Sequence, residues 1–256
     1  MLQTLPKVQM VKNNSTDFAV IILLFQNPAF KGFSRPFDLD IAGKKMWKFV
    51  ELACSGFAIK TTVCNPETDI LALIKPMLSD AKYTMVFFSD TPLLQKSTVA
   101  EIADFAQMRQ INVLKLPRGY VFDTQYIKSV TSITNSHTEY FGDEDFTQVF
   151  DLRQLEFVAN IMKNRILEYH QKNGVYIKDN NSTFIDVDVV IESGVVIEPH
   201  NVLKGRTIIS KNTTLLPNNV LDSSVVGSGC TLKGAFIANA KIPSGTTVEA
   251  FEKIEG

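Results

Sequence analysis

The sequence predicts two fold classes in succession, an α/β layered domain followed by a short parallel β-helix, and two observations predict them. Before Gly174, continuous apolar runs alternate with helical patterns, as they do in layered α/β domains. After Gly174, aliphatic residues recur at every sixth position. A chain of 256 residues is long enough to hold both parts.

Continuous apolar runs in the first half predict strands that are covered on both faces. These runs occupy residues 18–25, 84–89 and 111–116, with a weaker run at 120–122. Helical spacing of apolar residues predicts two helices between them, over 44–54 and 98–108. Thr98 and Glu101 have the spacing of a capping box, so we expect the second helix to begin at Thr98.

The longest helical pattern lies just before the change of period. Apolar residues at intervals of three and four predict a helix over 151–171, and residues 172–174 supply a cation and a glycine that end it. We expect this helix to connect the two parts. The predicted domains are residues 1–172, which end in the connecting helix, and residues 173–256, which form the β-helix.

A period of six residues carries the prediction of the β-helix. Aliphatic residues occupy it without a miss at Ile185, Ile191, Ile197, Leu203, Ile209, Leu215 and Leu221. Three residues after the first six of these come Asp188, Gly194, His200, Arg206, Asn212 and Asn218, and several of these residue types tolerate the left-handed backbone that a repeated corner requires. An α-helix has no period of six, and a flat strand has a period of two. We therefore expect each aliphatic side chain to stack on the one a coil above.

The predicted β-helix is short. The strict spacing breaks at Gly227, and an approximate pattern continues to Val248. At about eighteen residues per three-sided coil, residues 183–248 make about four coils with open ends. Such open β edges need a cap or a partner.

Composition excludes several classes of partner. Lys and Arg number 26 against 27 Asp and Glu, so nothing indicates nucleic acid or an anionic membrane as a partner. The apolar run at 18–25 is far too short for a membrane span, and residues 1–17 lack the basic start and cleavage site of a signal peptide. Three scattered cysteines show neither metal-binding nor disulfide spacing, which favours a reducing, cytoplasmic location.

The junction between the two parts carries a family resemblance. Within residues 165–210, an Asn-Gly-Val-x-Ile step occupies 173–177, a Ser-Thr-x-Ile-Asp entry occupies 182–186, and a coil with His200 in place of an Asn occupies 199–207. This series of motifs resembles the bacterial N-acetylglucosamine-1-phosphate uridyltransferases, the UDP-GlcNAc pyrophosphorylase family. The resemblance implies a Rossmann-like domain of the nucleotidyltransferase type, a hexapeptide-repeat left-handed β-helix, and a homotrimer formed through that β-helix.

The first half is similar to the same family in four segments that keep the family's order. They are residues 18–25, similar to its first strand, 40–53, similar to the step into its second helix, 84–94, similar to its metal-binding strand and turn, and 149–158, similar to the start of its last helix. The resemblance thus covers most of the chain. It implies a sugar phosphate or a sugar nucleotide as the ligand.

The loop after the first strand departs from the family. There the family has a Gly-rich loop whose backbone N–H groups and basic side chains hold the nucleotide phosphates. In residues 24–37 the pair of glycines is gone, Pro28 removes a donor, and Phe25 and Phe30 add bulk. The Gly-Thr of the family's uracil-reading segment is missing from residues 68–78, and its sugar-binding segment is deleted.

Two positions match the magnesium site of the family. Asp90 aligns with its metal-binding Asp, and its metal-binding Asn falls at Phe150 or Asp151. The resemblance therefore implies a remnant Mg²⁺ site of Asp90 and Asp151. Turn chemistry after the strand also accounts for Asp90. A helix N-cap, with Gln154 three residues on, accounts for Asp151, and we favour the cap.

Basic residues near the altered loop are candidates for binding a phosphate. Lys31, Arg35 and Lys44 carry positive charge, although a solvated surface is the commoner explanation. His200 lies at a predicted corner, and β-helix acyltransferases use a His as general base. That chemistry needs a long stack and a trimeric cleft, neither of which is evident in about four coils, so we favour a surface His.

Three functions follow, in order of preference. The first is a sugar-1-phosphate nucleotidyltransferase homologue that has lost its phosphate loop and is structural or regulatory, without turnover. The second is an active Mg²⁺-dependent nucleotidyltransferase, in which a sugar phosphate attacks the α-phosphorus of an NTP and releases pyrophosphate. The third is acyl transfer on the β-helix. The missing Gly-rich loop favours the first.

Overall fold

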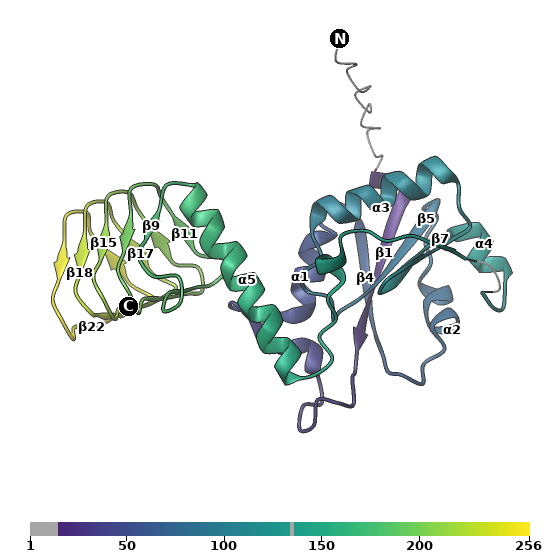
Figure 1. Ribbon diagram of the computed structural model, residues 1–256, viewed down its shortest axis with the longest axis horizontal. Coiled ribbons are helices and arrows are strands. Elements are labelled where there is room, and N and C mark those ends of the chain that lie inside the picture. Colours follow the sequence, from purple (N-terminus) through teal and green to yellow (C-terminus); the bar gives the residue numbers. More distant parts are fainter. Residues whose placement is uncertain (1–14, 134–135) are drawn as a thin grey trace, which may run out of the picture. The chain divides into compact units, whose positions relative to one another are not determined.

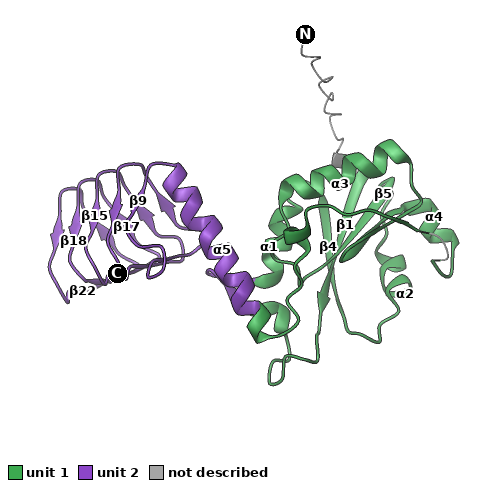
Figure 2. Ribbon diagram, in the orientation of Figure 1, with its two compact units in different colours: residues 1–39, 46–154 green, residues 40–45, 155–256 purple. Residues whose placement is uncertain are grey.

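A computed structural model describes residues 15–133 and 136–256. Contacts divide the chain into two compact units (Figures 1 and 2). Unit 1 comprises residues 1–39 and 46–154, and unit 2 comprises residues 40–45 and 155–256. In the described part of the chain, no helix is long and apolar enough to cross a lipid bilayer. The prediction that the N-terminus carries no signal peptide falls mainly on residues 1–14, which lie outside the described residues.

Unit 1 is built on a mostly parallel six-stranded sheet. In sheet order the strands are β4 (Ala58–Cys64), β1 (Phe18–Phe25), β5 (Tyr83–Phe88), β7 (Gly119–Asp123), β6 (Val113–Leu116) and β8 (His137–Thr138). β1 pairs in parallel with β4 and β5, and β7 runs antiparallel to both of its neighbours. All predicted strands of the first half are present. β4 escaped prediction because it is an edge strand with largely exposed side chains, so it has no continuous apolar run.

Helices cover both faces of this sheet (Figure 1). They are α1 (Met46–Ala53), α2 (Ile70–Ile74), α3 (Lys96–Arg109) and α4 (Thr124–Ser129), with short 3₁₀ turns η1 (Ser15–Asp17), η2 (Pro36–Asp38), η3 (Lys75–Met77) and η4 (Asp143–Phe146). On one face, α2 and α4 pack on a cluster that includes Ile21, Leu23 and Val86. On the other face, α1 contacts β1, β5 and α3. Burial of β1 on both sides confirms the α/β layered domain.

Helix α3 begins earlier than the capping-box spacing predicts. It starts at Lys96 with Gln95 as the N-cap residue, so Thr98 lies inside the first turn. The Thr98 hydroxyl donates instead to the buried carboxylate of Asp145. The same carboxylate accepts from the backbone N–H of Gln95 at 3.2 Å and from its side-chain amide at 3.0 Å. A carboxylate from a distant segment thus anchors the start of the helix and accepts the hydrogen bond of the Thr98 hydroxyl, which the sequence had assigned to a cap.

The helix predicted over 44–54 begins two residues later than expected, at α1. The two preceding residues form β3 (Lys44–Lys45), which pairs antiparallel with β2 (Asp40–Ile41) in a short hairpin. Gly43 turns this hairpin with a φ of 80°, which favours glycine. A Cβ atom at Gly43 would lie 2.4 Å from Cγ of Asp186, so the hairpin also packs tightly on the first coil of unit 2.

The connecting helix is α5 (Leu152–Lys172), and most of it belongs with the β-helix. We expected the whole helix to lie in the first domain, whereas the contacts place it in unit 2 from Leu155 onward. One reason is that Lys163 Nζ donates to the carbonyl of Asn181, in the first coil, at 2.6 Å. Gly174, with a φ of 87°, follows the helix as predicted.

Unit 2 stacks short parallel strands into three sheets (Figure 1). In sheet order these are β10-β13-β16-β19-β22, β11-β14-β17-β20 and β21-β18-β15-β12-β9. The strands are β9 (Tyr176–Ile177), β10 (Phe184–Ile185), β11 (Val190–Ile191), β12 (Val196–Ile197), β13 (Val202–Lys204), β14 (Ile208–Ile209), β15 (Thr214–Leu215), β16 (Val220–Asp222), β17 (Val225–Val226), β18 (Thr231–Leu232), β19 (Phe236–Ala238), β20 (Lys241–Ile242), β21 (Thr247–Val248) and β22 (Lys253–Glu255). This stack confirms the predicted β-helix and extends it beyond residues 183–248 on both sides. Its handedness stays a prediction.

The period-six aliphatic residues form the interior of the β-helix, as predicted. From Ile185 to Leu221, each of them is at most 7% exposed. The interior continues through Val226, Leu232, Ile237, Ile242 and Val248. Val226 follows Leu221 by five positions, so the strict period ends after Leu221, as the predicted break at Gly227 requires.

Of the six expected corner positions, four have a left-handed backbone, in line with the prediction that several of these residue types tolerate it. A positive φ occurs at Gly194, His200, Asn212 and Asn218. Asp188 and Arg206 do not adopt one. In the corner after β13, the left-handed residue is instead Gly205, with a φ of 60°, one position before Arg206. Glycine adopts the left-handed conformation without steric cost, so Gly205 and not Arg206 takes it at this corner.

Candidate functional site

Asp90 lies just after β5, at the edge of the sheet where the parallel strands end. It is only 2% exposed. In the turn that follows, the Thr91 hydroxyl donates to the Phe88 carbonyl at 3.1 Å. Ligands of open α/β sheets bind outside this edge, so the position suits a functional residue.

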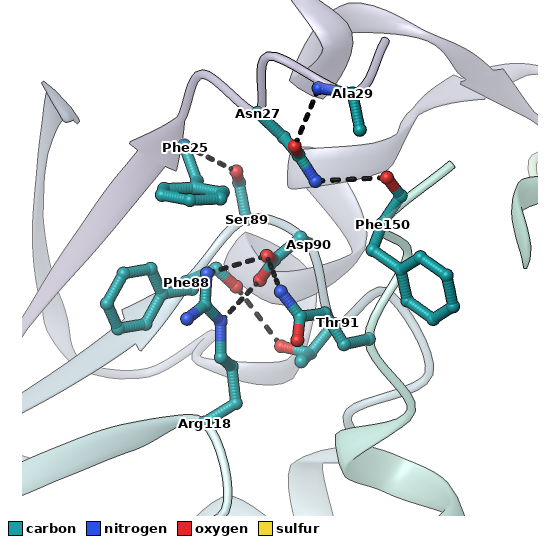
Figure 3. Close-up of polar contacts among 10 residues, drawn as sticks. Phe25, Asn27, Ala29, Phe88, Ser89, Asp90, Thr91, Arg118 and Phe150 are labelled. Carbon is teal, nitrogen blue, oxygen red and sulfur yellow. Dashed lines mark hydrogen bonds and ion pairs between the residues drawn. The ribbon is translucent and has the colours of Figure 1, made fainter. Parts of the chain in front are cut away.

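Side-chain donors occupy both carboxylate oxygens of Asp90 (Figure 3). Arg118 donates through Nε to Oδ1 at 3.1 Å and through Nη2 to Oδ2 at 2.8 Å. Gln148 Nε2 also donates to Oδ2, at 2.8 Å. The backbone carbonyl of Asp90 accepts from the N–H of Val149 at 2.7 Å. A bidentate guanidinium–carboxylate pair fixes the relative position of the two side chains, and the positive charge of Arg118 balances the negative charge of Asp90.

Arg118 lies in the tight turn between β6 and β7, and the next residue sets its position. A Cβ atom at Gly119 would lie 2.4 Å from the carbonyl oxygen of Val86, so the approach of β7 to β5 requires glycine there. The Arg118 guanidinium lies over the ring of Phe88 at 3.8 Å and over that of Phe25 at 4.7 Å. Two rings and one carboxylate therefore hold the cation.

Cys64, at the end of β4, lies close enough to this pair for their charges to influence it. Burial raises the pKa of the Cys64 thiol to about 11, while Arg118 lowers this pKa and Asp90 raises it. Burial likewise raises the pKa of Cys54 to about 12. Both thiols are therefore protonated at neutral pH, and neither supplies a nucleophile.

Asp151 caps helix α5, the role that we favoured for it. Its Oδ1 accepts from the backbone N–H of Gln154 at 2.7 Å, which satisfies a donor of the first turn. Among the residues that the structure describes, no group of three or more His, Cys, Asp and Glu side chains can hold a metal ion. The Mg²⁺ site of Asp90 and Asp151 stays a prediction.

Four backbone N–H groups in the loop after β1 donate to acceptors in the same loop. At distances of 3.0 to 3.3 Å, acceptors within the loop receive the N–H groups of Ala29, Phe30, Lys31 and Phe33. Asn27 supplies two of these acceptors, and its side-chain amide donates to the Phe150 carbonyl at 3.0 Å (Figure 3). Pro28 has no N–H group to offer. These four internal hydrogen bonds fold the loop into a turn.

A cavity of about 590 Å³ lies against this loop. Its polar lining residues include Gln26, Lys31, Ser34, Asn65 and Glu67. Lys31 therefore lines a cavity, and its role in phosphate binding stays a prediction. The other two candidates are paired elsewhere, because Arg35 contacts Asp38 and Lys44 contacts Asp188, each at 2.7 Å.

His200 lies at an exposed corner of the β-helix with a φ of 61°. Its backbone N–H donates to the Ser182 hydroxyl at 3.0 Å. This geometry is that of a corner residue, the role that we favoured over a general base.

Sequence reasoning missed Arg118 and Gln148. They are 28 and 58 positions from Asp90, with no motif spacing between them. One signal was available for Arg118. It follows the strand predicted over 111–116 as Asp90 follows the strand over 84–89, and the carboxyl ends of parallel strands meet at one edge of a sheet.

Several curated proteins similar to this chain carry the name bifunctional protein GlmU. The bifunctional protein GlmU of Clostridium acetobutylicum is 38% identical over 145 residues, which cover 55% of this chain and 32% of that protein. GlmU of Clostridium kluyveri is 37% identical over 101 residues, 40% of this chain and 22% of that protein. For Clostridium botulinum the identity is 34% over 134 residues, 50% of this chain and 29% of that protein. The chain therefore spans a third or less of the length of these curated relatives, which confirm the predicted resemblance over about half of it.

Comparisons with family models and with solved structures add little. No family model matches the chain. A solved structure of CMP:2-keto-3-deoxy-manno-octonic acid synthetase complexed with CTP aligns with a TM-score of 0.45 and 12% identity, over 58% of this chain and 99% of that one. A likeness of this degree supports no conclusion about function.

Proposed function

We propose that this protein is a non-catalytic homologue of sugar-1-phosphate nucleotidyltransferases, with a structural or regulatory role. The loop after β1 is the observation that carries the proposal. The family resemblance implies that free backbone N–H groups hold the nucleotide phosphates there. In this chain the N–H groups of Ala29, Phe30, Lys31 and Phe33 bond within the loop, and Pro28 has none. These contacts occupy donors that a bound triphosphate would need.

The surroundings of Asp90 support the same proposal. Mg²⁺ prefers a shell of oxygen ligands, most of them carboxylate, phosphate or water. At Asp90 both carboxylate oxygens already accept from N–H donors of Arg118 and Gln148. A metal ion at this carboxylate would compete with these donors and would lie beside the Arg118 cation.

An enzyme assay tests the proposal directly. The full-length protein is incubated with UTP, Mg²⁺ and N-acetylglucosamine 1-phosphate, and pyrophosphate release is measured beside an active nucleotidyltransferase. We expect release no faster than in the absence of protein. Sustained release that is lost in Asp90→Asn would establish the alternative, an active Mg²⁺-dependent nucleotidyltransferase.

The cavity against the loop favours ligand binding without turnover as a second candidate function. Its volume of about 590 Å³ and its amide, hydroxyl and charged lining suit a small polar molecule. Calorimetry with a sugar nucleotide and with a sugar phosphate tests it, with Lys31→Ala as the variant. Binding that weakens in this variant, without pyrophosphate release, would identify a sensor. Absence of heat with both ligands would favour a scaffold.

We also propose that the protein assembles as a homotrimer through its β-helix. The outward side chains of two sheets form apolar columns, which comprise Phe184, Val202, Val220 and Phe236 on one sheet and Val190, Ile208 and Val225 on the other. Phe184 is 51% exposed and Val190 is 53% exposed, and contiguous exposed apolar surface marks interaction sites. The third sheet carries more polar outward residues, such as Thr214, Thr231 and Thr247.

Light scattering tests this assembly. We expect a trimer mass for the unmodified protein and a smaller mass for Ile208→Glu, which places a charge on an apolar column. Thr231→Glu, on the polar sheet, is the matched control and should keep the trimer. A monomer mass for the unmodified protein would overturn the proposal.

A further inference from the structure

One buried carboxylate joins three segments of unit 1 that are far apart in the sequence. Asp90 follows β5, Arg118 lies between β6 and β7, and Gln148 lies just before α5. The two side-chain partners are 28 and 58 positions from Asp90. Asp90 therefore connects the strand edge with the chain that leads into α5.

The segment before α5 is held at three consecutive residues, of which Figure 3 labels Phe150. The side chain of Gln148 and the backbone N–H of Val149 both donate to Asp90, at 2.8 Å and 2.7 Å. The carbonyl of Phe150 accepts from Asn27 at 3.0 Å. Two of these three contacts depend on the position of Asp90.

The position of Asp90 depends in turn on its counter-charge. Its side chain is 3% exposed, and an ionised carboxylate at such a depth is costly unless it is paired. Arg118 provides the charge with a fork that bonds both oxygens, and its plane lies over Phe88. A lysine would supply the charge without the fork or the stacking.

We infer that Arg118 is a positioning residue, a built-in cation whose pairing with Asp90 fixes residues 148–149 and through them the start of α5. Arg118 acts through Asp90. The inference involves neither a nucleotide nor turnover, so it goes beyond the proposed function and does not rest on it.

Hydrogen exchange followed by mass spectrometry tests the inference at the N–H of Val149. In Arg118→Ala we expect this amide to exchange at least about tenfold faster than in the unmodified protein. Lys115→Ala removes an exposed cation from β6, in the same hairpin, and should change the rate by less than about twofold. Millimolar ethylguanidinium should restore the slow exchange in Arg118→Ala, because it replaces the missing fork. Ethylammonium should not restore it.

Two results would overturn the inference. One is an unchanged rate at Val149 in Arg118→Ala, and the other is restoration by ethylammonium or Mg²⁺ as well as by ethylguanidinium. If Arg118→Ala does not fold, Asp90→Asn serves in its place, because it keeps the size of the side chain and the carbonyl that Val149 binds. It should raise the same exchange rate, and a normal rate there would equally defeat the inference. The pyrophosphate assay on unmodified protein decides the proposed function separately.

Discussion

The two units bury their side chains by different rules. In the β-helix, each inward aliphatic residue stacks on an equivalent residue one coil away, as Ile191 does on Ile209. Around Asp90, the contacts join unlike residues that are 28 and 58 positions apart. Repetition spreads the stabilisation of unit 2 over many similar contacts. The Asp90 cluster depends on only a few partners. Loss of Arg118 would therefore leave the buried carboxylate charge of Asp90 without its counter-charge.

The largest effect is expected from breaking the Asp90 pair. Arg118→Ala should lower the free energy of unfolding of unit 1 by about 4 kcal/mol, because it leaves a buried carboxylate without its counter-charge. Urea denaturation followed by circular dichroism measures this change. Lys115→Ala, with an exposed side chain, should cost less than about 0.5 kcal/mol. Equal costs in the two variants would show that the cluster is no more sensitive than the surface.

A core truncation in the β-helix should have the next largest effect. Leu215→Ala should cost about 3 kcal/mol, since Leu215 is 0% exposed and stacks between neighbouring coils. Thr214→Ala, directly beside it on the outer face, should cost less than about 1 kcal/mol. The same denaturation experiment compares them. Similar losses would contradict the assignment of inward and outward positions.

The helix cap offers a smaller and more specific test. Asp151→Ala should destabilise the protein by about 1 kcal/mol, because the first turn of α5 loses the acceptor of the Gln154 N–H. Asp151→Asn should be nearly neutral, because Asn is an equally good cap. Thermal unfolding measures both. If Asp151→Asn were as damaging as Asp151→Ala, the carboxylate charge would have a role beyond capping.

The smallest effect concerns pH in the first coil of the β-helix. Burial raises the pKa of Asp186, with a further contribution from the charge of Asp40, and outweighs the hydrogen bond from the Gly205 N–H at 2.9 Å that lowers it. A carboxyl whose pKa is higher in the folded state costs stability above that pKa, and the cost disappears below the unfolded value. Asp186→Asn keeps an acceptor for Gly205 and removes the charge, so it should stabilise unit 2 at neutral pH.

This gain should fade as the pH falls toward about 3, where the native carboxyl is itself protonated. Denaturant unfolding at several pH values measures it. A gain that stays constant over this range would exclude ionisation of Asp186 as its origin.

Repeating patterns and contacts between residues that are close in the sequence could be predicted from the sequence alone. The inward positions from Ile185 to Leu221 were identified because a β-helix repeats one environment, and a repeated environment selects a repeated residue type. The strand over 18–25 was found for a related reason, since a strand covered on both faces must be apolar throughout. The cap at Asp151 needed only its neighbours along the chain.

Contacts between distant segments emerged only from the folded chain. Thr98 had the spacing of a cap, yet it lies inside the first turn and donates to a carboxylate 47 positions away. Asp90 was identified as a candidate metal ligand and as a turn residue, and neither interpretation indicated its contacts with Arg118 and Gln148. These hydrogen bonds form because the strand order brings the ends of β5 and β6 to the same edge of the sheet. The spacing of residues in the sequence reflects local structure such as helices, strands and caps. The order of the strands in the sheet determines which distant side chains can contact one another.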